Sequence, residues 1–79
     1  MSINIYWAPT EPFKGYDVDT GTPSSTKKML TEAFGELPIT LSTDDLGVLR
    51  GLHIAGTQGI SDLIEALEKH SLIRVWFEA

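Results

Sequence analysis

The sequence contains no cysteine. Disulfide bonds, thiolate zinc sites and cysteine nucleophiles are therefore excluded, and stability has to come from the packing of side chains. Basic residues are also scarce, at six against eleven acidic residues, which gives a net charge of −5. This sign of charge disfavours contact with the phosphate backbone of nucleic acids. We therefore predict no direct nucleic-acid partner.

Long apolar runs are absent as well. No stretch approaches the roughly 18 apolar residues that a membrane-spanning helix needs, and residues 1–7 lack the basic flank and apolar run of a signal peptide. We therefore expect a cytoplasmic protein without a membrane partner. The 79 residues are predicted to form one domain, 1–79. A domain of this size buries only about 60% of its unfolded surface, which leaves no interior for a large cofactor, and we predict none.

The clearest pattern lies in residues 60–79. Apolar side chains recur there with the spacing of one helical face, at Ile60, Leu63, Ile64 and Leu67. Charged residues fill the other face, and the helix is expected to begin near Gly59 and to end near Ser71. Residues 72–78 are β-branched and aromatic and alternate in polarity, as a strand does. We expect the apolar side of this strand to pack against the helix.

The N-terminal part alternates in the same way. Residues 3–8 are predicted to form a strand, which Pro9 ends because proline cannot donate to a sheet. Residues 9–22 are rich in turn-forming residues and have no sustained period, which predicts a long polar loop. Thr22 is expected to cap a first helix over residues 23–34, which ends at a glycine.

Residues 38–41 are predicted to be a short extended segment. Ser42 and Asp45 then have the spacing of a capping box, which favours a helix over residues 46–55. The alternative for this segment is a strand, because Val48, Arg50, Leu52 and Ile54 also alternate with their neighbours. The capping signal and the glycine at position 56 favour the helix.

Together these elements predict an α+β fold. A small three-stranded sheet, in which the first and last strands are neighbours, is covered on one side by two to three helices, in the order β-α-β-α-α-β.

One stretch, Asp17–Gly21, can be compared with sequence motifs of known chemistry. As a calcium loop it places its glycine one residue early and has Lys28 where the bidentate glutamate belongs. Asp19-Thr20-Gly21 resembles the Asp-Thr-Gly of dimeric retroviral-type aspartic proteases, but those enzymes are all-β and the apolar residues before the motif are missing. A polar turn is the favoured interpretation.

The two histidines do not predict a metal site. His53 and His70 lack converging partners, and zinc requires three or four ligands. His70 suits the C-terminus of a helix, and we expect His53 to be a partly buried core residue. With no nucleophile motif and no dinucleotide fingerprint present, we predict that the protein is not an enzyme.

The remaining candidate for a functional site is the protein surface. The uncovered side of the predicted sheet carries Tyr6, Leu72, Arg74 and Trp76, and aromatic residues and arginine are enriched at interface centres. The alternative is a half-buried aromatic pair under the loop that contains Phe13 and Tyr16. Acidic side chains define either a negative face for a basic partner or a merely solvated surface; they are Asp44, Asp45, Asp62, Glu65 and Glu68.

Our functional hypothesis is a small acidic domain that binds a larger protein as an inhibitor or adaptor. Such proteins occur in phage and mobile elements, and we retain that origin as part of the hypothesis. The alternative is a structural subunit that forms a homodimer through the open face of the sheet. The residues predicted to contact the partner are Tyr6, Phe13, Tyr16, Asp44, Asp45, Arg74 and Trp76.

Overall fold

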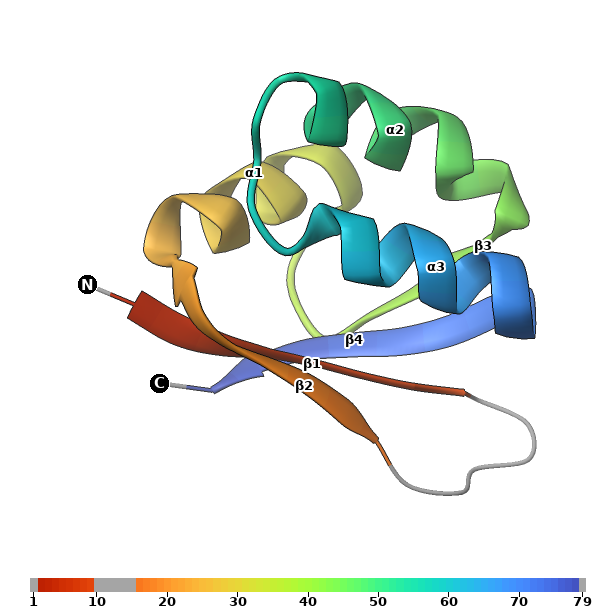
Figure 1. Cartoon of the computed structure of the whole chain (residues 1–79), viewed down its shortest axis with the longest axis horizontal. Helices are drawn as coiled ribbons and strands as arrows, with labels where there is room; N and C mark the ends of the chain where they lie inside the picture. The colour runs from red at the N-terminus through yellow and green to blue at the C-terminus, as the bar shows by residue number, and fades with distance from the viewer. Residues whose placement is uncertain (1, 10–15, 79) are drawn as a thin grey trace.

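The computed structural model describes residues 2–9 and 16–78. The chain forms a four-stranded antiparallel sheet with the strand order β2-β1-β4-β3, and three helices lie on one of its faces (Figure 1). The elements are β1 (Ser2–Pro9), β2 (Asp17–Pro23), α1 (Ser24–Phe34), β3 (Ile39–Ser42), the short 3-10 turn η1 (Thr43–Asp45), α2 (Leu46–Ile54), α3 (Ile60–His70) and β4 (Leu72–Glu78).

The predicted α+β class and the pairing of the first and last strands are confirmed. Strands β1 and β4 are antiparallel neighbours at the centre of the sheet, with Tyr6 opposite Trp76. The predicted number of strands is wrong, because β2 adds a fourth strand beside β1. The order of elements is therefore β-β-α-β-α-α-β, with η1 as a lead-in to α2.

Strand β2 lies within the segment that was predicted to be a loop over residues 9–22, except for its last residue, Pro23. Pro9 closes β1, and β2 begins at Asp17, so the predicted loop is too long at both ends. The middle of it, residues 10–15, lies outside the described residues. Gly21 adopts a left-handed φ of 76° where the register between β1 and β2 shifts, as in a β-bulge. Pairing with β1 therefore gives this segment its extended form, because its turn-type composition does not favour a strand.

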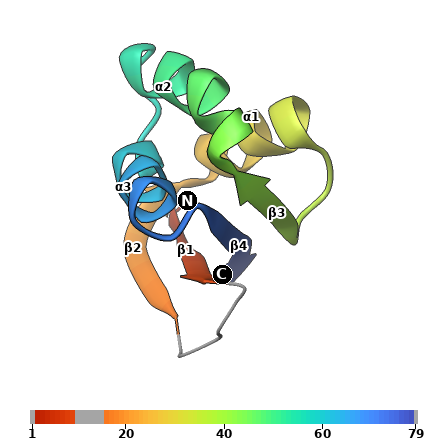
Figure 2. The same cartoon turned by 90° about the vertical axis from the view of Figure 1, so that its right-hand side faces the viewer.

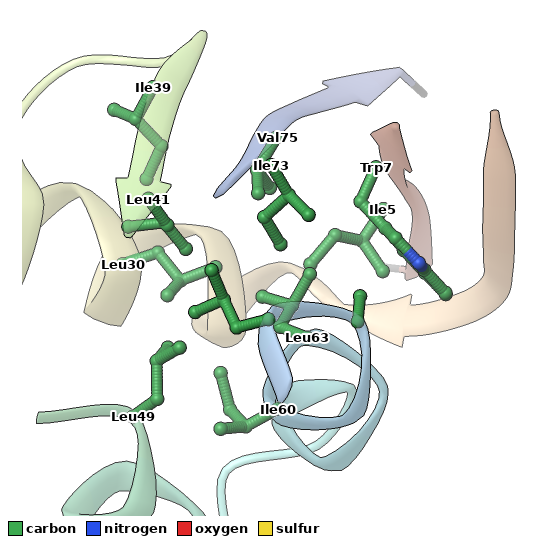
Figure 3. Close-up of a cluster of buried hydrophobic side chains, with 12 residues drawn as sticks. Ile5, Trp7, Leu30, Ile39, Leu41, Leu49, Ile60, Leu63, Ile73 and Val75 are labelled. Carbon is green, nitrogen blue, oxygen red and sulfur yellow. The ribbon is translucent and has the colours of Figure 1, made fainter. Parts of the chain in front are cut away.

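The core lies between the sheet and the helices (Figure 3). Helix α3 places Ile60, Leu63 and Leu67 there with no exposed surface. On the sheet, the apolar side of β4 is buried at Ile73 and Val75, as predicted. Other buried side chains of the same cluster are Ile5, Trp7, Leu30, Ile39, Leu41, Leu49 and Ala66.

The ambiguous segment after Asp45 is helical, and the predicted capping box is confirmed. The backbone N–H of Ser42 donates to the Asp45 carboxylate at 2.9 Å, and the Ser42 side chain accepts from the backbone of Asp45. Helix α2 buries Leu49, but His53 is exposed, so the expectation of a partly buried histidine is wrong. His53 lies one turn after Leu49 on nearly the same side of α2, so its exposure follows from its place in the last turn of the helix and not from the helical face that it occupies.

Helix α1 begins one residue later than predicted. Pro23 rather than Thr22 occupies the N-cap position, and Thr22 is buried at the end of β2. None of the helices within residues 16–78 has both the length and the apolar composition to cross a membrane.

Helix α3 ends at a residue with a strained backbone. Ser71 has a left-handed φ of 68°, and its N–H donates to the carbonyl of Leu67 at 2.8 Å. This conformation lets the chain reverse directly from α3 into β4. A residue with a Cβ atom pays about 1–2 kcal/mol for it, whereas glycine adopts it freely.

We predict that Ser71→Gly raises the free energy of unfolding by about 0.5–1 kcal/mol, because the strain disappears. Ser61→Gly is the matched control, since Ser61 is an exposed residue in the first turn of α3. The control should lower stability by up to about 1 kcal/mol, because glycine is a poor helix former. Urea denaturation of the three proteins measures both effects, and a loss of stability in both variants would contradict the prediction.

Candidate functional site

The face of the sheet opposite the helices is the candidate site. Figure 2 shows the helices on one side and the strands side by side in the order β2, β1, β4, β3. Side chains alternate between the two faces of each strand, so the residues between the buried ones point to the uncovered face. On the two central strands these are Tyr6 of β1 and Arg74 and Trp76 of β4. We call this surface the open face.

Three aromatic rings form a cluster at the centre of the open face. Tyr6 and Trp76 are direct cross-strand partners, and their rings stack with centroids 5.6 Å apart and planes inclined by 10°. Tyr16, just before β2, packs edge-on against both rings, with centroids 5.3 Å from Tyr6 and 6.0 Å from Trp76. Such contacts stabilise each pair by about 0.5–1.5 kcal/mol beyond the burial of area. The aromatic cluster is therefore held in one arrangement.

Exposure differs within the aromatic cluster. Tyr16 is 59% exposed, whereas Tyr6 and Trp76 are half-buried. Asn4 lies two residues from Tyr6 on the same side of β1, with 3.5 Å between its amide nitrogen and the phenol oxygen. The cluster thus presents a large apolar surface with polar atoms at its edge.

Arg74 lies beside the aromatic cluster, two residues from Trp76 on the same side of β4. Its guanidinium donates to the Thr40 hydroxyl of β3 at 2.8 Å, and the residue is exposed. This hydrogen bond orients the side chain along the sheet and uses one of its five N–H donors. Among the described residues, no further hydrogen bond or ion pair engages the other donors.

The structure brings together four of the seven predicted contact residues, namely Tyr6, Tyr16, Arg74 and Trp76. Phe13 lies outside the described residues. Asp44 and Asp45 do not belong to the open face, because they form η1 at the start of the helical layer. The Asp45 carboxylate is already engaged by the N–H of Ser42, so it serves the helix start.

The acidic residues do not form the single negative face that the sequence suggested. Glu68 of α3 lies 3.6 Å from Arg50 of α2, in an exposed ion pair that contributes little to stability. Asp62 and Glu65 instead lie near Asp17 of β2, around a hollow of about 160 Å³. Sequence reasoning missed this grouping because it assigned Asp17 to a loop.

Asp19 of β2 also belongs to this acidic group. A side chain on Gly59 would begin 3.5 Å from its carboxylate oxygen, so Asp19 lies at the N-terminus of α3, where the helix dipole favours a negative charge. Burial raises the pKa of the Asp62 carboxyl above its ordinary value of 3.8, and so do a hydrogen bond with Asp19 and the negative charges of Asp19 and Glu65. Both aspartates therefore place a carboxylate at the N-terminal end of α3.

These carboxylates do not form a metal centre. In residues 2–9 and 16–78 no three His, Asp or Glu side chains converge closely enough to hold a metal ion. Both histidines are exposed.

We predict that Asp62→Asn raises the free energy of unfolding at pH 7, by up to about 1 kcal/mol for this partly exposed group. A raised pKa means that the folded protein binds this proton more tightly, so ionised Asp62 lowers stability above its folded pKa. The penalty disappears as the pH falls through that pKa towards 3.8. The gain over the wild type should therefore shrink as the pH falls.

Urea denaturation at several pH values measures this difference. Asp44→Asn is the control, because it removes an exposed carboxylate and leaves the pair of Asp19 and Asp62 intact. A gain from Asp62→Asn that is equal at pH 4 and pH 7 would show that the pair does not carry the effect.

The chain was compared with protein-family models, with curated proteins and with solved structures. None of the three comparisons gave a match. The family of this chain is therefore not identified by resemblance, and its function has to be argued from the open face itself.

Proposed function

We propose that the protein is a non-enzymatic binding domain that covers a surface of a larger protein and acts as its inhibitor or adaptor. The observation that carries the proposal is the aromatic cluster of Tyr6, Tyr16 and Trp76 with Arg74 beside it, at the centre of the open face. Tyrosine, tryptophan and arginine are the residues that dominate binding energy at interface centres.

The rigidity of the aromatic cluster supports this function. Each ring contacts the other two, and the hydroxyl of Thr40 holds Arg74. Side chains that are fixed before binding lose little conformational entropy when a partner covers them. An exposed cluster that is already ordered therefore suits recognition of a folded surface.

The charge of the chain narrows the kind of partner. A net charge of −5 favours encounter with a basic protein surface and repels other acidic proteins. Arg74 then supplies one positive group within the open face, for a carboxylate or carbonyl of the partner. We attribute no reaction to the domain, since the proposed mode of action is occupation of a surface.

Affinity capture from a lysate of the producing cell, with mass spectrometry, tests the proposal. We expect a specific partner with the wild-type protein and at least about a tenfold weaker affinity with Tyr16→Ala or Arg74→Glu. Both residues are exposed, so neither substitution should unfold the domain, and circular dichroism verifies this.

Ile54→Ala is the matched control. Ile54 is 85% exposed at the end of α2, on the helical side of the molecule. This variant should retain the partner. A partner that is retained by Tyr16→Ala and Arg74→Glu but lost by Ile54→Ala would contradict the proposed surface.

Self-association through the same face is the competing proposal. It is a structural homodimer in which two aromatic clusters meet across a two-fold axis. Two copies with the same net negative charge repel each other at low salt, which favours the heterologous partner. Sedimentation over a wide range of concentrations separates the two: a monomer throughout agrees with a different partner, and a dimer lost in Tyr16→Ala would replace our proposal.

A further inference from the structure

Within residues 2–9 and 16–78, the last residues of β4 have a neighbouring strand on one side only. On one side β4 pairs with β1 as far as Glu78. On the other side β3 reaches only to Val75, the partner of Ile39. Residues 76–78 therefore form a free edge on the β3 side. In Figure 1 the chain that enters β3 comes down from the helical layer rather than along β4.

The free edge presents backbone hydrogen-bonding groups. Consecutive residues of a strand direct their N–H and C=O groups to alternate sides. At least one of Trp76, Phe77 and Glu78 must therefore direct both groups to the β3 side. Within the described part of the chain, no backbone group or side chain outside the strand ladders bonds to them. Unpaired groups of this kind are a template for an added strand.

A hollow of about 380 Å³ opens beside the free edge. Its volume falls within the range of natural ligand pockets. Leu37 and Phe77 are half-buried members of its apolar lining, and Pro38, which directly precedes β3, has no N–H to offer. The complete lining is Lys27, Thr31, Glu36, Leu37, Pro38, Trp76 and Phe77.

The charges around the hollow favour a basic occupant. The lining itself holds one acidic and one basic residue, Glu36 and Lys27, and Glu78, which follows Phe77 on the free edge, makes the surroundings negative. The net charge of −5 has the same sign. A segment that carries lysine or arginine beside an apolar residue therefore complements this site in charge and in polarity.

We propose that an extended segment of the partner protein adds to the sheet along residues 76–78 of β4. Its backbone pairs with the free edge, one apolar side chain enters the hollow, and a basic side chain next to it meets Glu36 or Glu78. Added strands gain affinity from main-chain hydrogen bonds and specificity from alternate side chains. The inference rests on the proposed function and extends it, since Trp76 belongs both to the aromatic cluster and to the hollow.

The probe for this proposal is a phage-displayed library of random peptides, each about ten residues long, which is the upper range of natural strands. Selection against the full chain should enrich peptides with an apolar residue next to lysine or arginine. In two-dimensional NMR, an enriched synthetic peptide should shift the amides of residues 76–78 and of Lys27. Methylation of the peptide's backbone nitrogens should abolish binding, because it removes the donors of the added strand.

Two threonine-to-tryptophan substitutions test whether the peptide binds in the hollow or elsewhere on the surface. Thr31→Trp places a large ring in the hollow from α1 and should weaken the peptide at least about tenfold. Thr43→Trp, at an exposed position of η1, should leave the affinity unchanged. Equal affinity for both variants, or failure to enrich any peptide, would overturn strand addition.

Capture of the partner with these variants tests strand addition separately from binding through the open face. Capture of a partner that is lost with Tyr16→Ala but retained with Thr31→Trp would refute strand addition and keep the open face as the binding surface. Loss with both variants supports both proposals. A peptide that shifts only Tyr6, Tyr16 and Arg74 would again refute strand addition alone.

Discussion

The fold depends on the packing of α3 against the two central strands. Helix α3 buries Ile60, Leu63 and Leu67 completely, and β4 buries Ile73 and Val75 on the facing side. Each such side chain contributes about 1.5–3 kcal/mol by leaving water. A chain of 79 residues without a disulfide has few other sources of stability. The tight reversal at Ser71 joins helix and strand, so this contact forms between neighbours in sequence.

The same contact determines which surface remains free. Because all three helices lie on one face of the sheet, the alternating side chains of β1 and β4 are divided into a buried set and an outward set. The outward set includes Tyr6, Arg74 and Trp76, because each of them alternates with a buried residue along its strand. The open face is thus the necessary counterpart of the core.

Sequence periodicity was sufficient to predict a helix or strand where the element had one apolar face and clear end signals. It predicted α3 and β4, with their boundaries at Gly59 and Ser71, and the capping box at Ser42. It failed for β2, because Asp17–Pro23 has the composition of a turn and is extended only through pairing with β1. It also misjudged His53, because helical periodicity does not show how far along α2 the contact with the core extends.

The candidate site, too, was predicted where it depends on local periodicity and missed where it depends on strand pairing. Alternation along the strands was enough to place Tyr6, Arg74 and Trp76 on one face, but the contact of Tyr16 with them depends on a pairing that local pattern did not reveal. The acidic group of Asp19 and Asp62 was missed for that reason too. Contacts between residues distant in sequence are where single-sequence reasoning ends.

Strand β2 forms one outer edge of the sheet, and its composition has a consequence for solubility. Two carboxylates, the bulge at Gly21 and a terminal proline make this edge a poor template for stacking into fibrils. These features disfavour edge-to-edge pairing of β2 between copies of the chain. The aromatic cluster is therefore presented beside a sheet edge that disfavours pairing between copies of the chain on that side.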